Sequence, residues 1–137
     1  MAFLILNADL FSETARKKAE EIANETVTDN KGKVKKVGVA YSQMRNFYDQ
    51  VVSFKTQVLP HIKTQKENEE FNKKLPYIKM LNAKFAYSKA RGNMSEKCRK
   101  FFSDLINEIK ENEVEKFMIF ADFFEAFMAF YKQYQPK

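Results

Sequence analysis

The segment from Phe117 to Tyr131 contains 13 apolar residues out of 15, and only Asp122 and Glu125 interrupt it. This run is too short and too charged to span a membrane, which takes about 20 consecutive apolar residues. An α-helix that is apolar on nearly every side has to be surrounded, either by helices of its own bundle or by a second chain. The chain must therefore build other helices around this one or associate through it.

Glycine and proline, which most often interrupt helices and form turns, number only three each in 137 residues. This scarcity excludes a β-sandwich or β-barrel, which needs a turn about every 8–12 residues. It also excludes the glycine-rich loops that bind dinucleotides and phosphates. Apolar residues recur instead at helical spacing, which predicts a single all-α domain, 1–137, of about five helices. We expect an N-terminal extension (1–9), a basic loop (26–41), and helices at about 10–25, 42–58, 64–90, 95–109 and 114–134.

Polar residues mark where these helices begin. Asp9 or Ser12 is the predicted N-cap of the first helix and Ser42 that of the second, because short side-chain oxygens accept hydrogen bonds from free backbone N–H groups. The fourth helix is expected to begin at Ser95, which places Glu96 near the positive end of the helix. Pro76 lies inside the third tract. Since proline lacks the N–H group, it either kinks this tract or starts a second helix.

The positive charge of the chain is concentrated in its middle third. The net charge is +6, and residues 42–93 alone carry ten basic and four acidic side chains, a net of +6. Residues 1–41 and 94–137 contribute +1 and −1. A basic region of this kind favours a polyanionic partner such as nucleic acid.

Four basic residues of the third tract and its end fall close to one line on the helix surface if the helix is continuous through Pro76. They are spaced by 7, 11 and 7 positions: Lys66, Lys73, Lys84 and Arg91. Tyr77 and Tyr87 flank this line. Lysine and arginine neutralise phosphates, and aromatic rings stack on bases, so the pattern suits RNA. The alternative is a solvated charged face without a ligand.

The second helix adds two further basic residues. Lys55 falls inside its apolar face, and Arg45 lies beside that face. Lys55 either binds a phosphate or packs its aliphatic stem against the core while its ammonium group reaches water.

Residues for catalysis or metal binding are scarce. The single histidine, His61, and the single cysteine, Cys98, form no zinc-binding set. Cys98 cannot form an internal disulfide and is predicted to be a buried, inert thiol, which fits a reducing, cytoplasmic location. Asp122 and Glu125 could bind a metal or share a proton, but we favour partners across a packing seam. We expect no enzyme activity and no cofactor.

Three blocks of sequence resemble a known family. The first block, YSQMRNFYDQV (41–51), is similar to a helix start of that family, which the chain matches with Ser42 and Arg45. The second block, KMLNAKFAYSKAR (79–91), is similar to a signature of that family, which the chain matches with Lys84 and Arg91. FADFFEAFMAFYKQY (120–134) is similar to its ending. The blocks occur in the order found in the small helical subunit of the type III-A CRISPR effector, the Csm complex. Ala90 departs from the family, in which glycine is common before the arginine.

The resemblance implies a non-catalytic subunit that stacks in several copies as an inner filament. Its partners would be guide RNA, target RNA and the other Csm subunits, and it would seat the guide–target duplex without reading bases. Self-association is expected, as a stack or as a dimer through the apolar C-terminal helix. Phe85, Phe123 and Phe124 are expected in the core. The predicted RNA-binding residues are Arg45, Lys55, Lys73, Lys84 and Arg91.

A second interpretation comes from a different class of protein. A dimeric helical adaptor or regulator could bind an acidic protein or duplex DNA through the same basic surface. The sequence contains no evident helix-turn-helix signature in favour of DNA. A competition between RNA and duplex DNA distinguishes the two interpretations.

Overall fold

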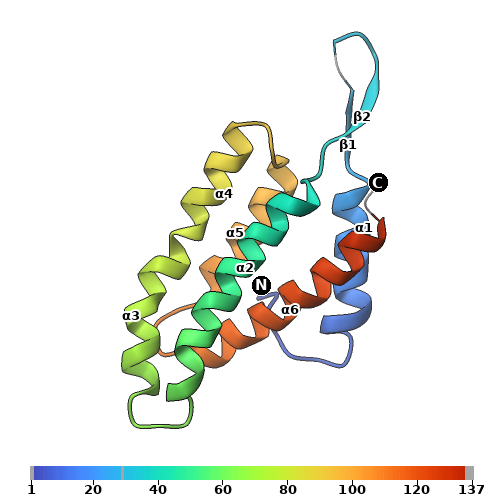
Figure 1. Cartoon of the computed structure of the whole chain (residues 1–137). Helices are drawn as coiled ribbons and strands as arrows, with labels where there is room; N and C mark the ends of the chain where they lie inside the picture. The colour runs from blue at the N-terminus through green and yellow to red at the C-terminus, as the bar shows by residue number, and fades with distance from the viewer. Residues whose placement is uncertain (1, 29, 135–137) are drawn as a thin grey trace.

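A computed structural model describes residues 2–28 and 30–134 of the chain. Over these residues the protein is a bundle of α-helices with one short β-hairpin, which confirms the predicted all-α fold (Figure 1). The elements are the π-helical turn η1 (Leu10–Thr14), α1 (Ala15–Ala23), β1 (Thr26–Thr28), β2 (Val34–Lys36), α2 (Tyr41–Val58), the 3₁₀ turn η2 (Leu59–His61), α3 (Glu67–Lys79), α4 (Leu81–Ala90), α5 (Glu96–Glu108) and α6 (Val114–Tyr134).

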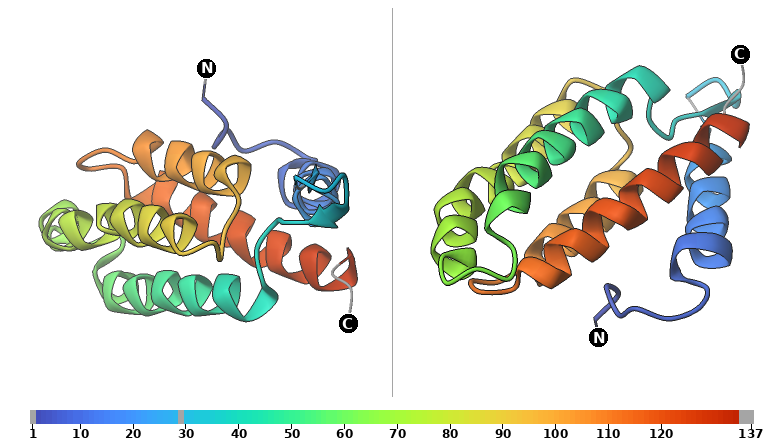
Figure 2. Two further views of the ribbon diagram at one scale, coloured as in Figure 1. Left: turned by 90° about the horizontal axis from the view of Figure 1, so that it is seen from above. Right: turned by 60° about the horizontal axis from the view of Figure 1, so that its bottom comes forward.

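Helix α6 occupies the centre of the bundle. It packs against α1 and α2, and Figure 2 shows these helices on either side of it. Its buried residues are Val114, Phe117, Phe120, Ala121, Phe123, Phe124, Phe127, Met128 and Tyr131. The chain's own helices thus surround this apolar helix, which was one of the two arrangements expected from the sequence. Dimerisation through α6 stays a prediction, since apolar residues of this helix such as Met118, Ile119 and Phe130 are only half-buried.

Aromatic rings join α4, α5 and α6 in what we call the aromatic seam, formed by Phe85, Phe102, Phe124 and Phe127. The ring centroid of Phe102 lies 4.9 Å from that of Phe124 and 5.0 Å from that of Phe127. All four rings are fully buried, and so is Phe123. Burying one such side chain stabilises a fold by about 1.5–3 kcal/mol. The prediction that Phe85, Phe123 and Phe124 are core residues is confirmed.

The third predicted tract is divided into α3 and α4. Pro76 lies inside α3, and the interruption comes four residues later, at Met80. The N–H of Ala83 donates to the carbonyl of Met80 over 3.0 Å, the tighter spacing of a 3₁₀ turn. Figure 2 shows a bend between the two helices. The tract is therefore one rod that bends four residues after Pro76, which agrees with the predicted kink, and Pro76 does not start a new helix.

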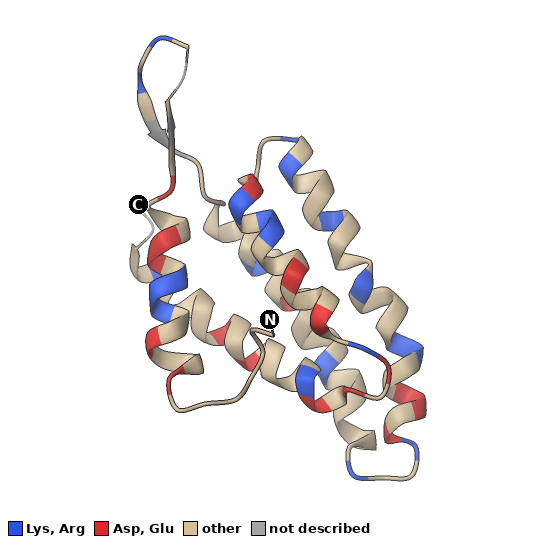
Figure 3. Ribbon diagram, turned by 180° about the vertical axis from the view of Figure 1, so that it is seen from behind, with Lys and Arg blue, Asp and Glu red and all other residues tan. Residues whose placement is uncertain are grey.

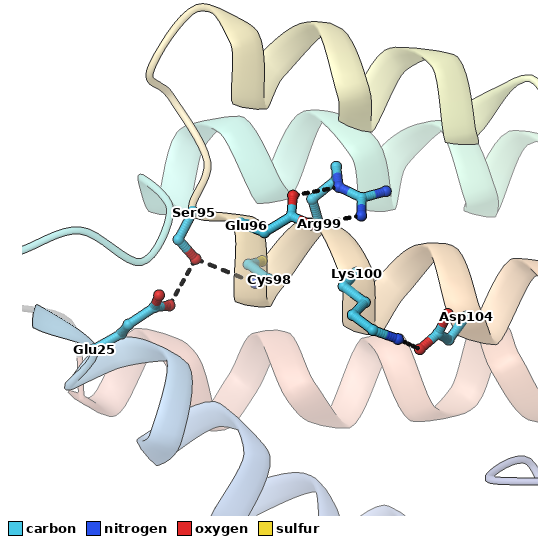
Figure 4. Close-up of polar contacts among 7 residues, drawn as sticks. All are labelled: Glu25, Ser95, Glu96, Cys98, Arg99, Lys100 and Asp104. Carbon is cyan, nitrogen blue, oxygen red and sulfur yellow. Dashed lines mark hydrogen bonds and ion pairs between the residues drawn. The ribbon is translucent and has the colours of Figure 1, made fainter. Parts of the chain in front are cut away.

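The predicted helix starts were partly correct. Ser95 caps α5, since its Oγ accepts a hydrogen bond of 3.1 Å from the N–H of Cys98 (Figure 4). Helix α2 instead starts at Tyr41 with Ala40 before it, so Ser42 lies inside the helix and is not its cap. Neither Asp9 nor Ser12 caps the first helix with its side chain, because η1 forms a π-turn whose backbone closes from Thr14 N–H to Asp9 carbonyl.

The basic loop predicted at 26–41 contains a β-hairpin, which corrects that prediction. Strands β1 and β2 are antiparallel, with Thr28 opposite Val34. The β-branched residues of β1 favour a strand, and Gly32 adopts a positive φ of 81° between the strands, where glycine is unstrained. Just beyond β2, a side chain at Gly38 would come within 2.7 Å of the carbonyl oxygen of Ile22, so only glycine fits there.

The N-terminal segment packs against the bundle although it is not helical. The carboxylate of Glu108 accepts hydrogen bonds from the N–H groups of Phe3 and Leu4, at 2.8 and 2.9 Å. Leu4 is buried, whereas Ile5 and Leu6 are exposed. Residues 2–9 therefore cover one side of α5 and leave apolar side chains at the surface.

Candidate nucleic-acid interface

The outer face of the α3–α4 rod exposes aromatic and apolar side chains. Tyr77, Met80 and Tyr87 are 58%, 50% and 64% exposed. On the inner face of α4, Leu81 and Phe85 are fully buried, so helical periodicity forces the opposite residues outward. Large exposed aromatic residues of this kind typically mark a binding surface.

Two of the predicted cations share this outer face. Lys84 and Arg91 lie one and three turns beyond Met80, so both side chains emerge on the side of Tyr77 and Tyr87. Helix α4 itself contains no acidic residue. Figure 3 shows Lys and Arg repeated along α4 and the adjoining end of α3, with acidic residues only at the far end of α3.

An open groove of about 500 Å³ separates this face of α4 from α2. We call it the α2–α4 groove. The ammonium group of Lys84 donates to Oε1 of Gln50 over 2.6 Å and thus reaches from α4 to α2. The ring of Phe47 packs edge-on against Phe85, at 4.9 Å between centroids, and fixes the distance between the two helices. The lining residues are Gln43, Asn46, Phe47, Gln50, Met80, Ala83, Lys84 and Tyr87.

The polar wall of this groove was not predicted from the sequence. Gln43, Asn46 and Gln50 follow one another by three and four positions, so their amides lie on one face of α2. An amide can donate to a phosphate or ribose oxygen and accept from a hydroxyl. Their spacing predicts a polar face of α2, but it does not indicate a groove unless α4 is known to lie beside α2.

Arg91 is held by an aromatic partner. Its Nη1 donates to the hydroxyl of Tyr87 over 3.0 Å, and its guanidinium carbon lies 5.6 Å from the centre of that ring. The partners of Lys84 and Arg91 are thus uncharged, and within the described residues neither side chain forms an ion pair. Both therefore present a full positive charge beside the α2–α4 groove.

Lys73 extends the basic face along α3, but its charge is shared. Its ammonium group lies 3.4 Å from Glu70 and 3.7 Å from Glu69, on the preceding turn. Its side chain is 59% exposed. A phosphate approaching Lys73 would have to compete with these two carboxylates.

Arg45 and Lys55 do not join the groove. Arg45 lies roughly 160° around the α2 axis from Gln43 and contacts Asp49 over 3.1 Å, a hydrogen bond that raises the pKa of Arg45. Lys55 reaches Asp122 on α6 over 3.4 Å. The five predicted cations are therefore divided between two surfaces, with Lys73, Lys84 and Arg91 on one of them.

One comparison with known proteins decides the family. The family model described as Csm2 Type III-A matches residues 7–137, essentially the whole chain. The chain belongs to the Csm2 family. No curated protein and no solved structure matches it. The Csm2 family is the structural small subunit of the type III-A CRISPR effector, which associates with the other Csm subunits, so the resemblance seen in the three sequence blocks is confirmed.

The acidic pair on α6 of this Csm2 family member serves the packing of α2 on α6. Asp122 pairs with Lys55, and Glu125 accepts a hydrogen bond of 3.1 Å from the hydroxyl of Tyr48. Burial and this carboxylate raise the pKa of Tyr48. The interpretation of the acidic pair as partners for Arg or Lys across a packing seam is confirmed for Asp122, whereas the partner of Glu125 across the seam is a tyrosine.

Other reactive groups are buried or dispersed. Cys98 is fully buried, and this burial raises the pKa of its thiol, in agreement with the predicted inert side chain. Among residues 2–28 and 30–134, no group of three metal-binding side chains comes together. In the same part of the chain no helix is both long and apolar enough to cross a membrane.

Proposed function

We propose that this Csm2 family member is a non-catalytic subunit that binds the backbone of target RNA, or of the guide–target duplex, through the α2–α4 groove. Several copies would stack as an inner filament and line the channel for the target. One observation carries the assignment to the groove. Lys84 and Arg91 have uncharged partners and lie beside exposed tyrosines on a helix without acidic residues.

The chemistry of the groove suits a sugar-phosphate backbone. Lys84 and Arg91 would displace the counterions of two phosphates, which favours binding without regard to sequence. The amides of Gln43 and Asn46 would bond to phosphate or ribose oxygens, and the ring of Tyr87 would stack on an unpaired base or a sugar. Base pairing with the guide reads the sequence, so the protein needs no base-specific contact.

The remaining predicted cations rank below these two. Lys73 lies in line with them, and an RNA that follows the rod would pass it. Arg45 and Lys55 are secondary contacts in this proposal, because RNA would first have to displace Asp49 and Asp122. We therefore rank Lys84 and Arg91 first, Lys73 second, and Arg45 and Lys55 last.

The test is fluorescence anisotropy with a single-stranded RNA of unrelated sequence, measured at several salt concentrations. Replacing both groove cations, Lys84→Ala with Arg91→Ala, should weaken binding and reduce the slope of log affinity against log salt by about 1.4, since each phosphate contact on a single strand contributes about 0.7. Circular dichroism should show unchanged helicity, because both side chains are exposed.

A matched control removes the same charge from another face. Lys97 and Lys100 on α5 are exposed and form ion pairs with Glu21 and Asp104. The variant Lys97→Ala with Lys100→Ala should bind RNA nearly as the parent does. If both double variants lose affinity equally, only net charge matters and the groove is not the site. If duplex DNA displaces the RNA more readily than RNA itself, the adaptor interpretation is favoured.

A further inference from the structure

The β-hairpin formed by β1 and β2, which we call the hairpin arm, stands away from the helical bundle (Figure 1). Residues 26–36 carry four lysines and one aspartate. Lys31 and Lys33 are exposed near the tip, and Val34 is 66% exposed although it is a β-branched apolar residue. The arm thus combines positive charge with an uncovered apolar side chain.

The base of the arm is fixed to α5 and α6. Ser95 at the start of α5 donates through its hydroxyl to Glu25 over 2.6 Å (Figure 4), and its N–H donates to the carbonyl of Gly38 over 2.8 Å. The buried hydroxyl of Tyr131 on α6 hydrogen-bonds both the N–H and the carbonyl of Val39. These contacts set the direction of the arm. An isolated two-stranded hairpin is only marginally stable, so a partner at its outer part would stabilise it.

The opposite end of the bundle carries an apolar groove of about 350 Å³, which we call the end groove. Its apolar lining is Leu6, Ile62, Val114, Met118 and Ile119. Leu6 is 64% exposed, and Met118 and Ile119 are half-buried. Figure 1 places the start of α3 and the loop into α6, which border this groove, far from the hairpin arm.

The charge around the end groove is complementary to that of the arm. Glu67 and Glu115 line it together with Lys63, and residues 108–116 beside it carry four glutamates and two lysines. Glu67 and Glu115 stand in the first turns of α3 and α6, where the helix dipole favours acidic residues. The dipole does not explain the apolar lining, in which Leu6 is exposed and Ile62, Met118 and Ile119 are half-buried, and an apolar side chain of a partner would cover it.

We infer that the hairpin arm of one copy docks in the end groove of the next copy in the stack. Val34 would cover Leu6, and the lysines at the tip would lie near Glu67 and Glu115. Because the two surfaces are different and lie at opposite ends, the contact is head-to-tail, and it repeats as an open stack when the rotation between copies does not close a ring. This inference rests on the proposed stacking of several copies and specifies the surfaces that form it.

The direct test is disulfide cross-linking within the assembled effector complex. The double variant Val34→Cys with Leu6→Cys places two thiols at exposed positions, and the native Cys98 is fully buried. Mild oxidation should produce a ladder of dimers, trimers and longer chains on a non-reducing gel. Each single variant should remain monomeric on that gel, because a head-to-tail contact brings Val34 to Leu6 and not to another Val34.

The number of copies in the complex, measured by native mass spectrometry, tests the stacking of copies separately from the docking of the hairpin arm. If the complex holds several copies and the double variant gives no cross-link, the docking inference is wrong while the stack remains. If the complex holds a single copy, the proposed stack and the docking inference both fail.

Charge reversal provides an independent test. Lys33→Glu should lower the number of copies per complex, and adding Glu115→Lys to the same chain should restore it. The affinity of the isolated protein for RNA should stay within twofold of the parent. A loss of RNA affinity with an unchanged copy number would assign the arm to RNA and overturn the docking inference.

Discussion

Aromatic residues occupy two contrasting regions of this protein. In the aromatic seam, Phe102 is fully buried and contacts the rings of Phe124 and Phe127. On the outer face of α4, Tyr87 is 64% exposed, and the guanidinium group of Arg91 lies over its ring. The first region stabilises the fold, and the second offers rings and charges to a partner. Residue type alone therefore does not separate core from site; the neighbours of each ring do.

The largest effect that tests this contrast is expected in the seam. Phe102→Ala removes a ring from the middle of four others and should lower the free energy of unfolding by about 3–5 kcal/mol. Tyr87→Ala should change that free energy by no more than about 0.5 kcal/mol, as exposed substitutions usually do. Urea denaturation followed by circular dichroism measures both values.

The RNA affinities of these two variants should rank in the opposite order. At a temperature where both are folded, Tyr87→Ala should bind RNA less tightly, and Phe102→Ala should bind as the parent does. If Tyr87→Ala were strongly destabilised, or if its affinity for RNA were unchanged, the assignment of the outer face of α4 to binding and not to stability would be wrong.

The sequence predicted the seam better than the site, for a physical reason. Burial follows local periodicity, so the apolar run from Phe117 to Tyr131 predicted the helix that became α6, with its observed bounds. The helix start predicted at Ser95 rests on an equally local pattern. The α2–α4 groove depends on how two helices lie side by side, and no local pattern in Gln43 or Gln50 contains that information.

The hairpin arm escaped prediction because local preferences compete. It combines β-branched residues with lysines and glycines, and the turn signals were given more weight than the strand signals. A kink of the third tract was one of the two alternatives for Pro76, but its position at Met80, four residues later, was not predicted. The acidic partner of Lys55 lies on α6, 67 positions along the chain.

A tyrosine at the end of the seam sharpens the contrast with Tyr87. Tyr131 stacks on Phe127 at 5.3 Å between centroids, and its hydroxyl hydrogen-bonds the backbone of Val39. Tyr131→Phe keeps the ring and removes these hydrogen bonds. The free energy of unfolding should fall by about 1–3 kcal/mol, the usual cost of leaving buried polar groups without a partner. Thermal denaturation at neutral pH measures this loss.

The pH dependence of stability identifies the hydroxyl as the cause. Burial raises the pKa of Tyr131 from 10.0 to about 12. Below pH 10 the phenol is protonated in both the folded and the unfolded chain, and its contribution is complete. Between pH 10 and 12 the unfolded chain releases a proton that the folded chain retains, so stability should fall by about 1.4 kcal/mol per pH unit.

Tyr131→Phe should remove most of that alkaline slope, whereas Tyr87→Phe should leave it unchanged because Tyr87 is exposed. An equal slope in the parent and in Tyr131→Phe would show that other tyrosines dominate the alkaline transition. Tyr48, whose pKa is also raised, is the first alternative to examine.

The smallest effect concerns the ion pair on the other side of α2. Lys55 is 33% exposed and Asp122 is 50% exposed, and exposed pairs of this kind stabilise a fold by less than about 1 kcal/mol. Lys55→Ala should therefore alter stability slightly. It should also lower RNA affinity less than Lys84→Ala does, because the charge of Lys55 is already balanced by Asp122. Anisotropy titrations of the two single variants at the same salt concentration compare them directly.

The variant Asp122→Asn tests whether Lys55 contacts RNA once its ion pair is removed. If Lys55 touches the phosphate backbone, releasing it from Asp122 should strengthen binding, whereas Lys55 as a packing residue should leave the affinity unchanged. Arg45 can be tested in the same way through Asp49→Asn, since that carboxylate is its acidic partner. A gain of affinity in either variant would extend the interface around α2, and equal losses in Lys55→Ala and Lys84→Ala would remove the distinction between the two surfaces.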